Sequence, residues 1–249
     1  TIKISKSLTI VSADNANRVK ISNSSNKVLA FEISGSGTEV RFEKIDFSGS
    51  GVSTAANPAR GMIYSSAGKL RLSYCTFSGC TVGINDVTGS ESAGAVTASG
   101  DLLRMNDCTF RYCRAVNHCA GSLGRQTAAP QCAGAVASIA KNTIVSRCSF
   151  VDNEADGFEN CGGSDKWVPG AIMAGCYAVP TDATPPVLTI MNSTFADNSG
   201  SSAVFALNNG LRIIGSTFVG NDGLALRFKL LQGFKDQYCQ TGSPNGNLY

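Results

Sequence analysis

Cysteines carry the most reactive side chains of this chain, and their number indicates disulfide bonds. The chain has 10 cysteines among 249 residues, whereas cytosolic proteins keep their thiols reduced and rarely pair them. Zinc is the alternative, but the sequence holds 1 histidine, His118, and no paired CxxC motif. We therefore interpret the cysteines as disulfide partners in an oxidising compartment, with the connectivity left open.

Arginines that recur at similar intervals form a second candidate site. Arg41, Arg71 and Arg104 would repel one another side by side, unless anions or carboxylates lay between them. One interpretation is a stripe that binds an acidic polysaccharide. The other is local pairing, for example with Glu43, or simple solvation.

A repeated phrase predicts the elements that position these residues. Each copy ends in phenylalanine, and the copies read Ile45-Asp46-Phe47, Cys75-Thr76-Phe77, Cys108-Thr109-Phe110, Cys148-Ser149-Phe150, Ser193-Thr194-Phe195 and Ser216-Thr217-Phe218. A second phrase stands 16 residues before the phenylalanine in several copies, for example Gly94-Ala95-Val96 and Gly134-Ala135-Val136. Internal repeats of this kind are typical of solenoids.

The residues before each phenylalanine alternate as they do in a strand. Leu70 and Leu72, seven and five positions before Phe77, are apolar with a polar residue between them. The phase then shifts, so each unit reads as strand, bend and strand. Stacked units would share one core, with coils ~4.8 Å apart. We predict an all-β fold, a right-handed parallel β-helix of about six or seven coils with an internal phenylalanine ladder. A β-propeller or leucine-rich repeat does not fit the 23 residues from Phe195 to Phe218.

The position three after each phenylalanine is polar or sulfur-bearing. It holds Ser50, Cys80, Cys113, Asn153, Asn198 and Asn221. An asparagine at such a bend can point inward, with its amide bonded to backbone groups and to the asparagine of the next coil. We expect this arrangement for the last three residues of the column.

Cysteines also fall into columns and into variable loops. The candidate pairs are Cys80 with Cys113, Cys75 with Cys108, Cys119 with Cys132, and Cys161 with Cys176. The first two pairs lie on adjacent units, at a separation that fits the Cα spacing of a disulfide. Cys148 continues the column of the second pair, and free buried thiols are the alternative. The last two pairs belong to insertions at 114–133, 154–169 and 176–186, and Cys239 would fix the C-terminal tail.

The repeats resemble those of a known family. Phe150-Val151-Asp152-Asn153, Phe195-Ala196-Asp197-Asn198 and Phe218-Val219-Gly220-Asn221 resemble the FxxN motif of polymorphic outer-membrane-protein repeats, and Gly134-Ala135-Val136 and Gly170-Ala171-Ile172 resemble a shortened GGA[ILV] motif. The resemblance covers roughly residues 26–226. It implies a right-handed parallel β-helix of the pectin-lyase-like kind and a secreted or surface-exposed, adhesin-like role.

Some enzymes with this shape cleave polysaccharides, which makes catalysis the competing interpretation. The hydrolases resemble one another in clustered aspartates and a Gly-His-Gly phrase, which this sequence lacks, and it also lacks a GxSxG nucleophile motif. His118 is interpreted as a loop residue. Asp152 and Asp197 share one column and are weak candidates for Ca²⁺, although aspartate also favours turns. No catalytic residue, resident metal or cofactor is therefore assigned.

Composition narrows the remaining functions. A net charge of +3, with no run rich in lysine or arginine, argues against nucleic acid. No segment approaches the ~20 apolar residues of a membrane-spanning helix. Asn23-Ser24-Ser25 and Asn192-Ser193-Thr194 are candidate glycosylation sites that fit secretion.

These observations predict one β-helix domain over residues 1–249, a piece of a longer protein. Residues 1–25 would cap it, residues 26–226 would form the coils, and residues 227–249 would form a tail or second cap. We expect an extracellular or cell-surface module with a structural or adhesive role, whose partners are other surface-protein subunits or polysaccharide. The alternative is a lyase that acts on acidic polysaccharide.

Overall fold

The computed structural model describes residues 1–14, 17–23, 31–52, 61–84, 92–117, 132–156, 168–175 and 185–230. Within these ranges the chain forms strands joined by bends, and no helix is present. All strand pairs there are parallel. The prediction of an all-β, parallel architecture is confirmed for this part of the chain. The same part contains no helix with the length and hydropathy needed to cross a membrane.

Two of the sheets take one strand from each round of the chain. The first sheet, of 8 strands, has the order β1 (Ile2–Ile4), β4 (Phe31–Ile33), β7 (Ile63–Ser65), β12 (Val96–Ala98), β17 (Val136–Ser138), β21 (Ile172–Gly175), β24 (Ser202–Leu207) and β27 (Leu224–Lys229). The second sheet, of 7 strands, has the order β2 (Leu8–Val11), β5 (Glu39–Glu43), β8 (Lys69–Ser73), β13 (Leu102–Asn106), β18 (Asn142–Ser146), β22 (Val187–Met191) and β25 (Gly210–Ile214).

The third sheet has two limbs that meet at β6 (Ile45–Val52). One limb contains β3 (Val19–Asn23), β9 (Thr76–Ser78), β14 (Thr109–Arg111), β19 (Ser149–Val151), β23 (Thr194–Ala196) and β26 (Thr217–Val219). The other limb contains β10 (Thr81–Ile84), β15 (Arg114–Asn117) and β20 (Glu154–Asp156). A separate pair joins β11 (Ser92–Ala93) to β16 (Cys132–Ala133).

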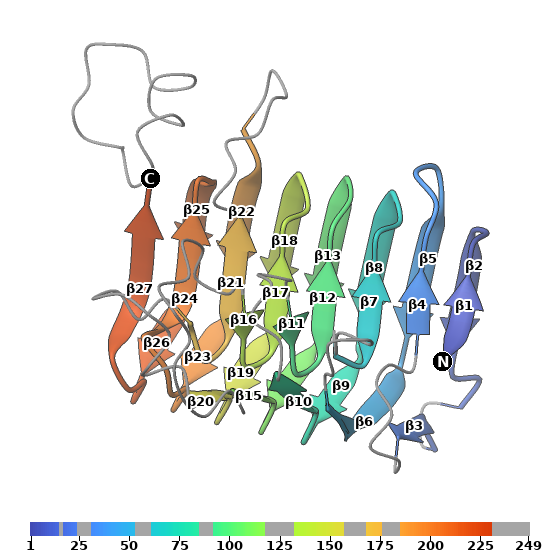
Figure 1. Cartoon of the computed structure of the whole chain (residues 1–249), viewed down its shortest axis with the longest axis horizontal. Coiled ribbons are helices and arrows are strands. Elements are labelled where there is room, and N and C mark those ends of the chain that lie inside the picture. Colours follow the sequence, from blue (N-terminus) through green and yellow to red (C-terminus); the bar gives the residue numbers. More distant parts are fainter. Residues whose placement is uncertain are drawn as a thin grey trace.

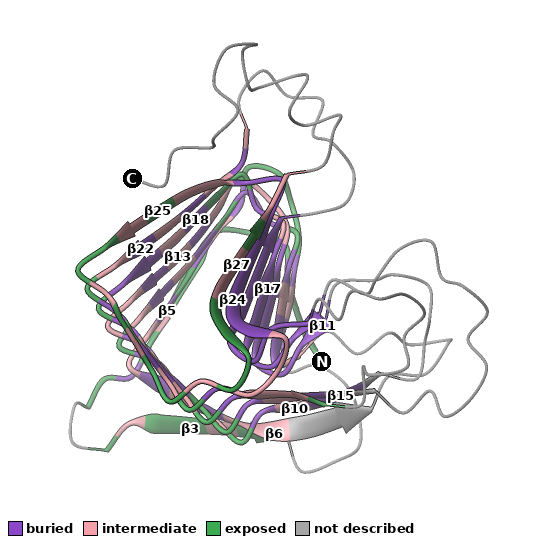
Figure 2. Cartoon of the chain, turned by 90° about the vertical axis from the view of Figure 1, so that its left-hand side faces the viewer, coloured by how far each residue is buried: buried purple, intermediate pink, exposed green. Residues whose placement is uncertain are grey.

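The chain visits these sheets in a fixed order. From β7 it enters β8, then β9, then β10, and it returns to the first sheet at β12, beside the strand where it began. Figure 1 shows the strands of successive rounds side by side, with β1 and β27 at opposite ends of the stack. Seen end-on, the sheets surround a common interior (Figure 2). Most of the buried hydrophobic residues of the sheets form one large cluster. The expected tail boundary at residue 227 falls inside β27, whose residues still pair with β24.

Phenylalanine rings fill the centre of this core. Phe47, Phe77, Phe110, Phe150 and Phe195 have no exposed surface, and Phe218 at the end of the stack is partly buried. Successive rings lie 4.6–4.8 Å apart, centroid to centroid, with interplanar angles of 1–8°. Burial of each ring contributes roughly 1.5–3 kcal/mol. The ring spacing matches the strand spacing, because one phenylalanine occupies the same register position in each coil.

Sharp bends separate the strands of one round. Between the second and third sheets the bend residue has φ of 49–58° in Lys44, Tyr74, Asp107, Arg147 and Asn192, and glycine follows at Gly215. After β9, β14, β19, β23 and β26 the equivalent bend residues are Gly79, Tyr112, Asp152, Asp197 and Gly220, with φ of 52–64°. Left-handed backbone turns the chain within one residue, so the next side chain points into the core again.

The glycine of the Gly-Ala-Val phrase is explained by close backbone contact. A Cβ on Gly134 would lie 2.0 Å from the carbonyl oxygen of Gly170, and one on Gly94 would lie 2.3 Å from that of Cys80. Real Cβ atoms do not approach this closely. The phrase therefore marks the place where neighbouring coils touch through their backbones.

Candidate functional site

The three arginines singled out in the sequence lie side by side on the outer face of the second sheet. Arg41 of β5 is in register with Arg71 of β8, which is in register with Arg104 of β13. Their Cα atoms are therefore ~4.8 Å apart from strand to strand. Because inward residues of these strands are buried and the alternate residues are not, the guanidinium groups face outward. We call Arg41, Arg71 and Arg104 the arginine stripe.

One carboxylate lies between the first two arginines. Glu39 Oε1 accepts hydrogen bonds from Arg41 Nε at 2.8 Å and Arg71 Nε at 2.8 Å, and it lies 2.6 Å from Arg41 Nη2. The hydrogen bond from Arg41, together with that from Arg71, holds the pKa of the Glu39 carboxyl below its ordinary value. Glu43, the partner suggested by the sequence, instead lies 3.7 Å from Lys44 Nζ. The period-two pattern contained a signal for Glu39, since it shares the outward face with Arg41.

The third arginine has no carboxylate partner among the described residues. Arg104 Nε donates to the side-chain oxygen of Asn106 at 3.4 Å. Lys69, in register with Glu39 and Leu102, is also exposed on this face. The stripe therefore retains positive charge at its Arg104 end. The column continues with Ile144 and Thr189 before Arg212, which lies apart from the other arginines.

Cys75, Cys80, Cys108 and Cys113 carry free thiols, so the expected disulfides Cys80 to Cys113 and Cys75 to Cys108 are wrong. Parallel strands in register place equivalent Cβ atoms side by side at ~4.8 Å, with their Cα–Cβ bonds pointing the same way. A disulfide needs Cβ atoms about 3.8 Å apart and directed toward each other. The Cα spacing permitted the bond, but the side-chain direction does not. Cys132 is buried, and its expected partner Cys119 lies outside the described residues, as do Cys161, Cys176, Cys239 and His118.

Cys80 and Cys113 make a hydrogen bond that asparagine makes at the same position of later coils, three residues after the phenylalanine. Cys80 Sγ lies 3.7 Å from the carbonyl oxygen of Phe47, and Cys113 Sγ lies 3.7 Å from that of Phe77. In the later coils the same bond is made by asparagine amides, which donate to Phe110, Phe150 and Phe195 at 2.9–3.0 Å. Each thiol or amide thus binds the carbonyl group of the preceding coil.

Burial and protonation state disfavour redox chemistry at Cys80 and Cys108. The neighbouring thiol of Cys113, together with burial, raises the pKa of Cys80 well above its ordinary value. Burial is the largest cause of the raised pKa of Cys108. Thiolates, not thiols, are the reactive species, so both side chains are inert while the fold is intact.

The remaining predicted sites lie at bends. Asp152 and Asp197 are exposed in left-handed conformation, in one column, and no group of three metal-ligating side chains occurs among the described residues. Asn192 is exposed at the bend before β23, where a glycan would meet solvent. Asn23 ends β3, which pairs with β6.

Sequence reasoning did not single out two exposed aromatic residues. Tyr74 and Tyr112 are 50% and 55% exposed, and both stand at bends where other coils have glycine, aspartate, asparagine, lysine or arginine. An aromatic residue in a column of glycine and polar residues was the signal available.

Comparison of the chain with protein-family models, curated proteins and solved structures gave no match.

Proposed function

We propose that the chain is an extracellular or cell-surface structural and adhesive module that binds acidic polysaccharide along the arginine stripe. In this proposal the sheets form a right-handed parallel β-helix of about six or seven coils, as the repeat predicts. The rigid stack supplies the adhesive surface, and the stripe supplies a site for carboxylate or sulfate groups. Planar guanidinium groups suit such anions because they donate two parallel hydrogen bonds.

The observation that carries the proposal is the register of Arg41, Arg71 and Arg104. Like charges on neighbouring strands destabilise a sheet unless something lies between them. Glu39 meets this need for Arg41 and Arg71, and Arg104 has no carboxylate among the described residues. An acidic polymer laid along the stack would supply the missing anion next to Arg104.

Retention on immobilised polygalacturonate, eluted with rising salt, tests the proposal. Arg104→Ala should weaken binding by about two- to fivefold, as expected for one exposed ion pair. Arg212→Ala is the matched control, because it removes the same charge from the same column away from the stripe. The proposal fails if the wild-type chain is not retained at low salt, or if both variants elute earlier by the same amount.

The same polymer separates adhesion from catalysis. A lyase would release unsaturated products, which absorb in the ultraviolet, when incubated with polygalacturonate. Binding without turnover is the expected result. Turnover would replace the adhesive function with the lyase alternative.

A further inference from the structure

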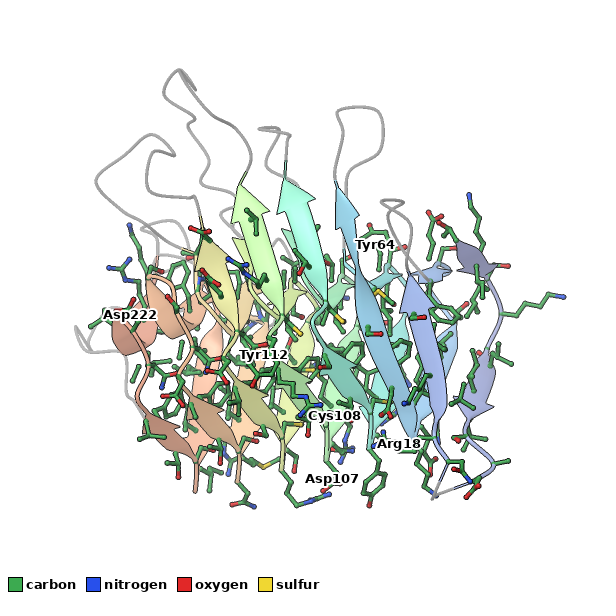
Figure 3. All side chains as sticks on the ribbon, turned by 90° about the horizontal axis from the view of Figure 1, so that it is seen from below. Arg18, Tyr64, Asp107, Cys108, Tyr112 and Asp222 are labelled. Carbon is green, nitrogen blue, oxygen red and sulfur yellow. The ribbon has the colours of Figure 1, made fainter. Side chains whose placement is uncertain are left out.

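Two tyrosines flank one limb of the third sheet on neighbouring coils. Tyr74 stands at the bend before β9, and Tyr112 stands at the bend after β14, the strand next to β9. Their side chains are 50% and 55% exposed. Figure 3 views the molecule from the side of this sheet, with Tyr112 labelled.

The backbone at both positions is unfavourable for a residue of this size. Each tyrosine has φ of 55°, a left-handed conformation that L-residues with a Cβ adopt at an energetic cost. The other residues of the two columns are glycine or polar, and Tyr74 and Tyr112 are the aromatic ones. The position of Tyr112 is held elsewhere by Gly79, Asp152, Asp197 and Gly220, and that of Tyr74 by Lys44, Asp107, Arg147, Asn192 and Gly215. Since the rings are exposed, burial does not offset this cost. Residues retained in strained conformation without packing are candidates for function.

Hydroxyl groups lie between the two rings. Thr76 is in register with Thr109, and Ser78 is in register with Arg111, whose Nε donates to Ser78 Oγ at 3.2 Å. The backbone is already bonded, because β14 has a parallel partner on each side, β9 and β19. A peptide therefore cannot add as a new strand here, and recognition must use side-chain hydroxyls and ring faces.

The charges around this surface are largely paired. Asp107 accepts two hydrogen bonds from Arg147, at 2.8 and 2.7 Å. Asp46 lies 3.2 Å from Arg18 Nη2. These pairs leave Arg111, bonded to Ser78, as the charged group between the tyrosines. Apart from Arg111, the surface thus offers hydroxyl groups and two flat ring faces, which suit a ligand that is rich in hydroxyl groups and has flat apolar faces.

We propose that Tyr74, Tyr112 and the hydroxyls of β9 and β14 bind a neutral polysaccharide chain. The sugar rings would stack on the two phenol rings, and the sugar hydroxyls would bond to Thr76, Thr109 and Arg111. Five positions of extended chain separate the two bends, at most ~16 Å, which suits a short oligosaccharide segment. This site is separate from the arginine stripe and does not depend on it.

Backbone contacts fix the two tyrosines in advance. Tyr74 N–H donates to the carbonyl oxygen of Asn106 at 3.0 Å, and the carbonyl oxygen of Tyr74 accepts from Arg18. Tyr112 N–H donates to the carbonyl oxygen of Val151 at 3.2 Å. A main chain that is fixed before binding loses little conformational freedom when the ligand binds, which favours affinity.

Affinity electrophoresis in gels that contain hydroxyethylcellulose, galactomannan or polygalacturonate tests this site. The double variant Tyr74→Asn/Tyr112→Asn removes both rings and places asparagine, which tolerates left-handed backbone, at the bends. Tyr74→Phe/Tyr112→Phe keeps both rings and serves as the control. Wild type and the Phe variant should be retarded by a neutral polymer, and the Asn variant should bind about tenfold more weakly or worse.

A thermal melt separates loss of binding from loss of fold. The Asn variant should melt at the same temperature as wild type or higher, because the strained tyrosines are gone. The proposal is overturned if no neutral polymer retards the wild type, or if the Asn variant binds like wild type. It is also overturned if only polygalacturonate is bound in a tyrosine-dependent way, since the ligand would then be acidic.

Discussion

Replacement of Asn198 by alanine should destabilise the protein strongly, because this buried amide joins three coils. Its Nδ2 donates to the carbonyl oxygen of Phe150 at 3.0 Å and to Asn221 Oδ1 at 2.9 Å. Its Oδ1 accepts from Asn153 N–H at 3.2 Å and from Asn153 Nδ2 at 2.9 Å. Asn153 Nδ2 and Asn221 Oδ1 keep other partners, at Phe110 O and Asn198 N–H.

The expected magnitude follows from the groups left without a partner. Asn198→Ala leaves the Phe150 carbonyl without its amide donor and the Asn153 N–H without its acceptor. Each unsatisfied buried group costs about 1–3 kcal/mol, so the variant should lose about 2–6 kcal/mol. Asn198→Cys should lose less than half as much, because Cys80 and Cys113 make the equivalent contact in the same column.

Urea denaturation measures these losses as changes in midpoint and slope. The matched control is Asn142→Ala, which removes an exposed amide from the outer face of β18 and should change stability by about 0.5 kcal/mol or less. A loss for Asn198→Ala within about 1 kcal/mol of this control would refute the role of the amide chain. A cysteine variant as unstable as the alanine variant would refute the equivalence of thiol and amide in this column.

Three further outcomes are expected. The stabilisation from pairing Glu39 with Arg41 and Arg71 is fully present above the pKa that Glu39 has in the unfolded chain. As pH falls through the lowered pKa of Glu39 in the folded chain, the carboxyl group is protonated, this stabilisation is lost and both arginines are released. Retention on a sulfated polysaccharide, which stays ionised, should therefore rise at acidic pH in wild type and be high at all pH in Glu39→Gln, and a flat wild-type profile would contradict the assignment. Peptide mapping after alkylation without reductant should find Cys80 and Cys108 unlabelled in the native chain and labelled in urea, whereas a disulfide-linked peptide would show the thiols to be paired. Gly134→Ala should lower stability by about 2 kcal/mol or more, because its Cβ would meet Gly170 O at 2.0 Å, and Gly37→Ala, with open space around the Cβ, should lose far less in the same urea titration.

Much of the architecture was predictable because each coil repeats one set of physical constraints. Phe150 and Phe195 recur at a fixed distance from their bends, so the ring column and the inward asparagines followed from spacing. The state of the cysteines was not predictable in this way. Cα spacing alone does not distinguish facing from parallel Cβ atoms, and Cys80 and Cys113 have parallel ones.

The candidate sites were predictable only in part. The register of Arg71 and Arg104 followed from the repeat, but the choice of Glu39 over Glu43 depends on side-chain rotamers. The pairing of Asp107 with Arg147 joins two bends on neighbouring coils, and neither residue belongs to the alternating pattern of a strand. Contacts between bends carry no period of their own, so the sequence offered no pattern for them.

The direction of the hydrogen bonds has a mechanical consequence. Backbone bonds run from each strand to the next along the stack, and β1 and β27 lie at its opposite ends (Figure 1). Tension applied between these two strands loads successive coil interfaces in series, so the weakest interface yields first. Coils would then detach one after another, each releasing a short length of chain. A stack with this property would extend stepwise under load and absorb work before it came apart completely.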